Sequence, residues 1–231
     1  MKPSTNIGEE LTPQQQKQLT ELLHKYQDIF TTDYGNLPYN PSYHHSINTG
    51  NATPIRQKPY RIPHHLKTFE KEHIQELLDN GVIRPSTSPW ASPILIVPKK
   101  GGWRLVVDFR KLNTVTEKDA YPLPRIDDLL DQLQNARYFS SMDLFTGFHE
   151  IPMDPKDIQK TAFLALGKLF EYLRMPFGLC NAPPTFQRMM NSVYAPLIHY
   201  CLIVYVDDSN IYSANFEDHL RDLEEFFKLT Q

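Results

Sequence analysis

Cysteine is nearly absent from this sequence of 231 residues, and no stretch of it stays apolar for long. The two cysteines, Cys180 and Cys201, form neither a disulfide framework nor a thiolate zinc site, which indicates a reducing, intracellular compartment. The longest apolar run, Tyr200 to Val206, is far too short to cross a bilayer, and residues 1–10 lack the apolar core of a signal peptide. We therefore expect a protein that is neither secreted nor membrane-spanning, with no membrane partner.

Glycine is also scarce, with 9 residues against 19 prolines, which excludes a collagen-like chain and favours extended connections over flexible linkers. The net charge of −3 hides an uneven distribution. Residues 55–125 carry 13 basic and 7 acidic side chains, whereas residues 126–231 carry 8 and 15. A +6 segment followed by a −7 segment is typical of a phosphate-binding surface beside a cation site, although uneven surface charge without a function is also common.

Two helices are predicted in the first third of the chain, with an extended arm between them. Thr12, Pro13 and Gln15 form a capping box with a first-turn proline, and leucines then recur at helical spacing. Residues 31–63 are rich in proline, asparagine, tyrosine and threonine without periodicity, which indicates a linker or arm. A second helix is predicted over residues 63–80.

Short strands and further helices follow, and adjacent strands are joined as hairpins. The predicted strands cover residues 92–98, 103–109, 138–144, 161–166, 169–173, 200–206 and 210–213, and the predicted helices cover 124–134, 182–197 and 216–229. The first hairpin ends in the basic, glycine-containing tip KKGG. Hairpins in place of strict β-α-β alternation indicate an α+β fold with an antiparallel sheet.

Three aspartates stand at the ends of predicted strands. Asp207 and Asp208 follow the apolar strand CLIVYV, and Asp143 follows FSSM. Unpaired buried charge is costly, so carboxylates that strands bring together need a cation. Their oxygens suit hard divalent ions such as Mg²⁺, and a pair of such ions assists in-line phosphoryl transfer. The alternative is that Asp207 and Asp208 form an exposed hairpin turn, where aspartate is common.

The string YVDD that contains two of these aspartates is the last of a series of motifs. In order, the series is RPSTSPWASPILIVPKK, WRLVVDFRKLN, YPLPRIDDLLDQL, FSSMDLFTGFHEI, KTAF, MPFGLCNAPPTFQRMMN and YVDD. Its order and spacing resemble the reverse transcriptases of gypsy-type LTR retrotransposons, which are part of a pol polyprotein, over roughly residues 14–231. The upstream segment HHSINTGNATPIRQKPYRIP resembles the arm that precedes the polymerase in those polyproteins.

The resemblance implies the fingers and palm of a right-hand polymerase, with an antiparallel palm sheet packed on helices. It places an N-terminal helix and arm in residues 1–56 and the fingers and palm in residues 57–231. It also implies an RNA-directed DNA polymerase, a nucleotidyltransferase that adds dNTPs to a primer 3′-hydroxyl on an RNA or DNA template. Two Mg²⁺ ions are the implied cofactors, with Mn²⁺ as an alternative.

The resemblance assigns roles to individual residues of this sequence. The implied catalytic and metal-binding carboxylates are Asp143, Asp207 and Asp208. The implied dNTP-binding residues are Lys99, Lys100, Arg104, Thr146, Gly147, Phe148 and Phe177. The implied template–primer residues are Arg110, Asn113, Gly178, Pro183 and Gln187.

Two of these roles have a simple physical basis. A mobile basic hairpin tip can close on phosphate charge, although the sequence leaves open whether Lys99 or Lys100 supplies the lysine. An aromatic ring at Phe148 would fill the space that a ribose 2′-hydroxyl needs and so favour deoxynucleotides. Without the flanking motifs, a solvated basic turn and a core phenylalanine are the more common explanations.

The sequence departs from the family pattern in two places. Ser209 and Asn210 follow YVDD where the family usually has apolar residues, and polar residues there can loosen the strand and the metal site. The sequence also ends before the family's primer grip, thumb, connection and RNase H, so we expect the thumb to be missing and other pol segments, including RNase H and integrase, to be partners. The alternative function is a truncated or host-retained fragment that binds nucleic acid or protein without polymerising. The location, in a cytoplasmic particle or the nucleus, is not distinguished.

Overall fold

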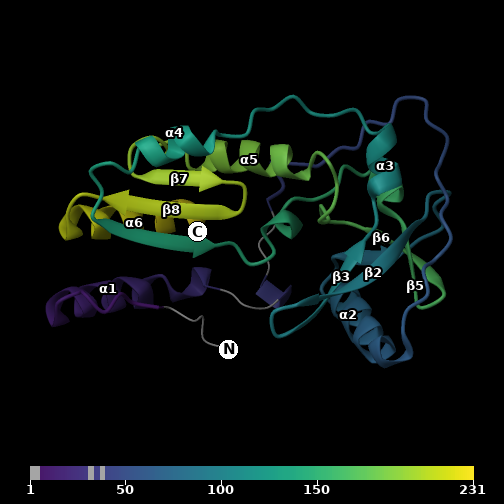
Figure 1. Cartoon of the computed structure of the whole chain (residues 1–231), viewed down its shortest axis with the longest axis horizontal. Coiled ribbons are helices and arrows are strands. Elements are labelled where there is room, and N and C mark those ends of the chain that lie inside the picture. Colours follow the sequence, from purple (N-terminus) through teal and green to yellow (C-terminus); the bar gives the residue numbers. More distant parts are fainter. Residues whose placement is uncertain (1–5, 31–33, 37–39) are drawn as a thin grey trace. The chain divides into compact units, whose positions relative to one another are not determined.

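The computed structural model describes residues 6–30, 34–36 and 40–231, which form two compact units (Figure 1). Unit 1 contains the residues up to 33 together with 121–145 and 186–231, and unit 2 contains residues 34–120 and 146–185. No helix among the described residues is long and apolar enough to span a membrane.

Unit 2 is built on a five-stranded sheet in the order β1-β6-β5-β2-β3. Its strands are β1 (Ile83–Pro85), β2 (Ser92–Lys99), β3 (Gly102–Val107), β5 (Phe163–Ala165) and β6 (Lys168–Tyr172). Neighbouring strands are antiparallel except β2 and β5, which are parallel. The helices of this unit are α2 (Lys67–Asp79) and α3 (Arg110–Val115).

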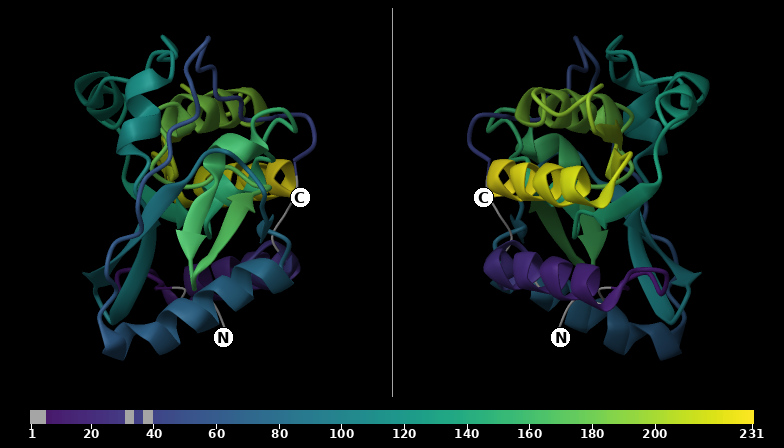
Figure 2. Two further views of the ribbon diagram at one scale, coloured as in Figure 1. Left: turned by 90° about the vertical axis from the view of Figure 1, so that its right-hand side faces the viewer. Right: turned by 90° about the vertical axis from the view of Figure 1, so that its left-hand side faces the viewer.

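The tip of the β5–β6 hairpin is fixed to helix α2. Figure 2 shows the hairpin (green) reaching toward the helix (blue), where Glu70 accepts the backbone N–H of Leu166 at 2.9 Å. Glu70 is 1% exposed and is also paired with Lys67 at 2.9 Å, so its buried charge is compensated. This contact ties the far end of a short hairpin to the helix.

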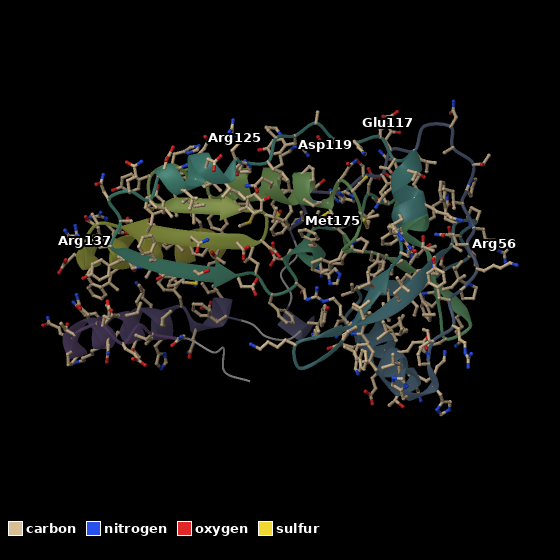
Figure 3. The ribbon with its side chains drawn as sticks, in the orientation of Figure 1. Arg56, Glu117, Asp119, Arg125, Arg137 and Met175 are labelled. Carbon is tan, nitrogen blue, oxygen red and sulfur yellow. The ribbon has the colours of Figure 1, made fainter. Side chains whose placement is uncertain are left out.

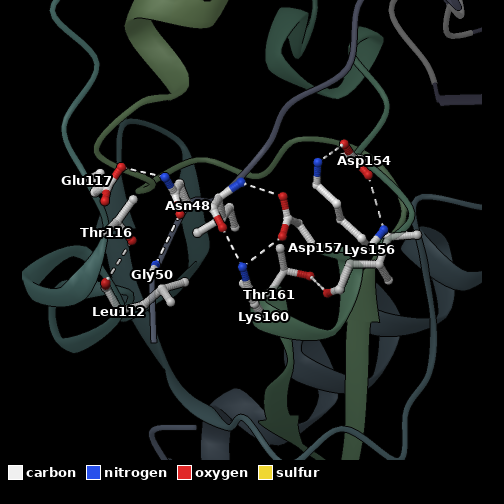
Figure 4. Close-up of polar contacts among 12 residues, drawn as sticks. Asn48, Gly50, Leu112, Thr116, Glu117, Asp154, Lys156, Asp157, Lys160 and Thr161 are labelled. Atoms are coloured by element: carbon white, nitrogen blue, oxygen red, sulfur yellow. Dashed lines mark hydrogen bonds and ion pairs between the residues drawn. The ribbon is translucent and has the colours of Figure 1, made fainter. Parts of the chain in front are cut away.

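The arm between the first two predicted helices is an ordered part of unit 2 rather than a free linker. Residues 31–33 and 37–39 of the predicted arm lie outside the described residues. In the remainder, Ile47 is 1% exposed, its N–H donates to Asp157 at 2.8 Å and its carbonyl accepts from Lys160 at 2.5 Å (Figure 4). Asp157 and Lys160 are also paired with each other at 2.8 Å, so the arm is hydrogen-bonded to both members of a largely buried ion pair.

Further along, the arm lies beside the start of strand β2. The N–H of Gln57 donates to the carbonyl of Ala91 at 2.9 Å, and the N–H of Ala91 donates to the carbonyl of Ile55 at 3.0 Å. Arg56 lies between these contacts, and its side chain points outward into solvent (Figure 3). The arm therefore adds positive charge to the surface of unit 2.

Unit 1 is built on an antiparallel sheet of three strands in the order β4-β8-β7, which run side by side in Figure 1. The strands are β4 (Tyr138–Asp143), β7 (Leu202–Tyr205) and β8 (Asp208–Ser213). Its helices are α1 (Pro13–Lys25), α4 (Ile126–Asp131), α6 (Phe216–Thr230) and most of α5 (Ala182–Val193).

A buried chain of hydrogen bonds fixes helix α6 to this sheet. Ser213 donates its hydroxyl to Asp222 at 2.7 Å and therefore accepts from Nδ1 of His219 at 3.0 Å. Nε2 of His219 then accepts the hydroxyl of Ser140 at 2.9 Å, which assigns the imidazole tautomer. The chain joins β4, β8 and α6 through groups that have partners.

Helix α1 and the residues just after it pack against α6. The rings of Tyr26 and Phe30, just after α1, each lie 5.5 Å from the ring of Phe227, and Lys25 is paired with Glu224 at 2.5 Å. Aromatic pairs of this kind bury a large apolar area, so they anchor α1 more firmly than the exposed ion pair does.

The sequence predictions of secondary structure are largely confirmed. The capping box of α1 forms between Thr12 and Gln15, and all the predicted hairpins are present. The α+β class is confirmed, but the parallel pairing of β2 with β5 was not expected. Strand β1 and helix α3 were also not predicted, because segments of three and six residues carry too little periodicity.

The docked arm makes the stability of unit 2 sensitive to acid. His45 is 1% exposed, and its Nδ1 forms a hydrogen bond of 3.0 Å with the hydroxyl of Thr185. Burial lowers the pKa of His45 to about 4, although the charges of Asp157 and Asp119 oppose that change. The unfolded chain then binds more protons than the folded chain between pH 6.5 and about 4, so stability is full above pH 6.5 and falls as the pH is lowered. We expect a loss of about 2 kcal/mol at pH 5 from this group.

Urea unfolding at pH 7.5 and pH 5 measures this effect. The variant His45→Gln keeps a hydrogen-bonding side chain that does not titrate, so its pH dependence should be flatter than that of the unsubstituted chain. Equal pH dependence in both proteins would contradict the assignment.

Candidate active site

Two of the three predicted carboxylates are direct cross-strand neighbours in unit 1. Asp143 ends β4 and Asp208 begins β8, and the register pairs them, so their side chains lie on one face of the sheet. Asp207 stands with Val206 in the two-residue turn between β7 and β8. Burial, and then the charges of Asp207 and Asp208, raise the pKa of Asp143. The three carboxylates therefore form one acidic cluster.

These carboxylates fit a hard divalent ion chemically, because each supplies oxygen ligands and their mutual repulsion favours a bound cation. Within the described residues, however, no group of three acidic, histidine or cysteine side chains is arranged to hold a metal ion as it stands. The chemical type of the donors nevertheless fits such an ion.

The turn that carries Asp207 has a strained backbone. Val206 has φ of 55°, in the left-handed region, which is a strong outlier for a β-branched residue. Its N–H donates to Oε1 of Gln187 at 2.8 Å, and Nε2 of Gln187 donates to Asn191 at 2.9 Å and to the carbonyl of Val204 at 3.4 Å. Gln187 thus holds the strained turn from helix α5.

This placement adds a function that the sequence did not indicate for Gln187. The resemblance assigns Gln187 to the template side, yet its side chain is 0% exposed in this structure. A template contact stays a prediction, whereas the support of the turn is a direct observation. No local pattern in the sequence indicates this support, because it depends on a turn 19 residues further along the chain.

The polar residues after YVDD do not interrupt strand β8. Ser209 is paired with Met142 and Val204, and Asn210 with Ser141 and Ile203. Ser209 is fully buried, and its hydroxyl has no hydrogen-bond partner. The departure from the family pattern therefore leaves an unpaired polar group beside the carboxylates while the strand stays continuous.

The basic hairpin of unit 2 places Lys99 and Arg104 on the same face. Val97 is paired with Arg104 across the two strands, and Lys99 lies two residues from Val97 on β2. The side chains of all three therefore lie on the same side of the β2–β3 hairpin. Lys100 lies in the turn, next to Gly101, whose φ of 82° suits glycine. The register thus favours Lys99 as the partner of Arg104, and the dNTP contacts of all three stay predictions.

The structure brings together the two aromatic residues that the sequence assigned to the nucleotide sugar. Phe148 and Phe177 are stacked, with ring centroids 4.8 Å apart and planes 26° apart. Phe148 is 7% exposed and Phe177 is 45% exposed. Phe148 lies in a short 3-10 helix, η4 (Gly147–Glu150), whose preceding residue Thr146 has a left-handed φ of 50°.

Apart from Gln187, the residues assigned to the template side belong to unit 2, and two of them shape one loop. Asn113 donates to the carbonyl of Gly178 at 2.8 Å and accepts the N–H of Cys180 at 3.0 Å. Gly178 has φ of 93°, and an added Cβ there would lie 3.5 Å from the carbonyl oxygen of Val107. Asn113 therefore shapes this loop.

Arg110 and Pro183 flank the same region. Arg110 is 80% exposed and makes two hydrogen bonds of 2.8 Å to Asp108, which hold the pKa of that carboxyl well below its usual range. Pro183 is half-buried in the first turn of α5. A template contact by Arg110 would have to share its guanidinium with Asp108.

The predicted site residues are distributed over both units. Unit 1 contains the three aspartates and Gln187, and unit 2 contains the other predicted nucleotide and template residues.

Comparison with known proteins agrees with these motifs. Residues 97–231 match the family described as reverse transcriptase (RNA-dependent DNA polymerase). The chain is 40% identical over 215 residues to the retrovirus-related Pol polyprotein from transposon 297 of Drosophila melanogaster, covering 90% of this chain and 20% of that protein. It is 35% identical to the Pol polyprotein from transposon gypsy of the same organism, covering 97% of this chain and 22% of the relative.

The fold is similar to that of a foamy viral protease-reverse transcriptase determined in complex with an RNA/DNA hybrid. The TM-score is 0.84 at 30% sequence identity, over 95% of this chain and 30% of that one. The present chain spans about a fifth of the length of the curated relatives named above. The matched segment contains the aspartate cluster, the stacked pair Phe148–Phe177 and most of the basic hairpin, and on these grounds the chain belongs to the reverse transcriptase family, in its gypsy-type LTR retrotransposon branch.

Proposed function

We propose that this chain is the nucleotide-adding part of an RNA-directed DNA polymerase. The observation that carries the proposal is the register that pairs Asp143 with Asp208 beside the Asp207 turn, in a chain of the reverse transcriptase family. The proposed reaction is attack of a primer 3′-hydroxyl on the α-phosphate of a dNTP, with pyrophosphate as the leaving group. The proposed partners are a template–primer duplex, dNTPs and other segments of a pol polyprotein.

Each proposed role follows from the chemistry of the side chain. Asp143, Asp207 and Asp208 would hold two Mg²⁺ ions, or Mn²⁺ ions. Such ions, when bound, supply charge stabilisation for the attacking and leaving oxygens. Lys99 and Arg104, both exposed on one face of the hairpin, would donate hydrogen bonds to the triphosphate.

Nucleotide and template would be held mainly by residues of unit 2. Gly147 has no side chain that would keep a phosphate oxygen away from its backbone, and its neighbour Thr146 turns the chain there. Phe148, backed by Phe177, would exclude a ribose 2′-hydroxyl. The Asn113–Gly178 contact would fix the loop against the template.

The proposal is supported by the foamy viral enzyme, whose structure was determined with an RNA/DNA hybrid. The alternative, binding of nucleic acid without polymerisation, makes no use of the acidic cluster. Loss of one carboxylate therefore separates the two functions.

The first site prediction concerns the carboxylates. Asp143→Asn should lower primer extension by roughly two or more orders of magnitude, because no neighbour replaces the lost charge. The measurement is extension of a primer on an RNA template by this chain joined to the segment that follows the matching region in the transposon 297 polyprotein. The control is Asp127→Asn, an equal charge change at a side chain 84% exposed on α4. Near-normal extension by Asp143→Asn would contradict a catalytic role.

A second prediction tests Phe148 as a steric gate. Phe148→Val removes the ring opposite the 2′-carbon, so the preference for dNTPs over rNTPs should fall by roughly tenfold or more. The measured quantity is the ratio of incorporation efficiencies in the same joined protein. Phe170→Val, which truncates another buried ring of unit 2, should lower stability without changing that ratio. An unchanged ratio for Phe148→Val would show that Phe148 is a core residue only.

A third prediction uses the hairpin register to distinguish the two lysines. Lys99→Ala should raise KM for dNTPs by roughly tenfold, since Lys99 shares a face with Arg104 and a lost charged hydrogen bond costs about 1.5 kcal/mol or more. Lys100→Ala, at the neighbouring turn position, should change KM much less. A larger effect at Lys100 would mean that the other face of the hairpin meets the nucleotide.

A further inference from the structure

Five rings of unit 2 form a continuous aromatic column, in which the exposed Phe177 stands between Phe148 and His149. Phe177 stacks on Phe148 at 4.8 Å and meets the ring of His149 edge-on, at 5.6 Å with an angle of 70°. His149 continues to Tyr172 at 6.1 Å, and Tyr172 continues to Phe163 at 5.1 Å. Exposure falls from 45% at Phe177 to 0% at Phe163, so the column runs from the nucleotide-facing rings into the core.

Folding stability alone does not account for the imidazole in this column. His149 is 5% exposed, and its Nδ1 is buried with no hydrogen-bond partner. Burial, and then the charge of Arg174, lower the pKa of His149 to about 4, so the ring is neutral near pH 7. A buried polar atom without a partner is destabilising, and a phenyl ring in this place would avoid that cost.

The backbone that carries the buried His149 ring is fixed by two hydrogen bonds. Its N–H donates to the carbonyl of Thr146 at 2.8 Å, and its own carbonyl accepts from Arg174 at 3.1 Å. By contrast, Phe177 is nearly half exposed and is restrained by its contacts with Phe148 on one side and His149 on another. The fixed ring therefore sets the orientation of the exposed one.

We propose that His149 is a positioning residue for nucleotide selection: its ring holds Phe177 edge-on and, through Phe177, holds Phe148 at the angle that excludes a ribose. The inference rests on the proposed function, because it gives Phe148 the role of the gate. His149 itself touches the supporting ring and not the nucleotide. Its effect should therefore be on the discrimination between sugars rather than on the chemical step.

The test measures binding to the full chain, so that it does not depend on catalysis. The chain is mixed with Mg²⁺ and a template–primer duplex that has a dideoxy primer end and a templating thymine. Calorimetric titration with dATP and with ATP then gives the ratio of the dissociation constant for ATP to that for dATP. His149→Leu removes the ring at similar volume and should lower this ratio roughly two- to tenfold, which is the range that one aromatic contact contributes. His149→Phe keeps a ring and should retain the ratio.

A matched control separates positioning from general softening of the core. Phe163→Leu removes a fully buried ring of the same column, three ring contacts from Phe177, and should lower the melting temperature without changing the ratio. An unchanged ratio in His149→Leu, or an equal fall in Phe163→Leu, would overturn the inference and leave the proposed function standing. No preference for dATP in the unsubstituted chain would overturn the gate assignment of Phe148 and the inference together.

Discussion

The hydrogen bond from the N–H of Val206 to the side chain of Gln187 is the contact on which the acidic cluster depends. It holds a β-branched residue in a left-handed conformation, at a cost of about 1–3 kcal/mol that the surrounding structure must offset. Because the turn has only two residues, its conformation decides where Asp207 stands relative to Asp208. Without the buried amide, a relaxed turn would move one carboxylate away from the others.

Through this contact, helix α5 supports the turn between β7 and β8. Asn191, one turn further along the helix, accepts a hydrogen bond from the side-chain amide of Gln187. The amide is therefore held by Asn191 on its nitrogen and by Val206 on its oxygen. The helix thus transmits the rigidity of its own backbone to the turn between β7 and β8. A catalytic carboxylate placed on a tight turn needs such a support, since loops alone position side chains less accurately than helices and strands do.

The sequence predicted those parts of the molecule whose signals are local. The capping box of α1, the hairpins and the aspartates at strand ends all depend on residues within a few positions of one another. The role of Gln187 could not be predicted, because it depends on a turn 19 residues away, and the burial of His45 by the docked arm depends on Thr185, 140 residues away. The parallel pairing of β2 with β5 was not predicted for the same reason, since no turn links the two strands.

Family motifs supplied what local patterns could not, and they did so unevenly. The stacked contact of Phe148 with Phe177 joins two residues that the resemblance had assigned to the same nucleotide, while their nucleotide contacts stay predictions. His149, the next residue in the chain, belongs to the same motif but received no role, because a buried histidine has no distinguishing pattern in the sequence. Its part became visible only when the ring contacts and the unpaired Nδ1 were known.

Unpaired buried polar atoms gather around the proposed chemistry. In the part of the chain that the structure describes, three buried side-chain polar atoms lack a partner, and they belong to Thr146, His149 and Ser209. Thr146 and His149 flank the proposed gate, and Ser209 follows the aspartates. Four described non-glycine residues have left-handed backbones, which such residues rarely adopt. Thr146 and Val206 lie near the proposed chemistry, whereas Leu166 and His199 lie in turns elsewhere. Elsewhere, buried charges such as Glu70 and Asp157 are paired. The fold therefore pairs its buried charges away from the proposed site and leaves buried polar atoms unpaired beside the carboxylates and the gate. It has given up stability where binding is proposed to occur.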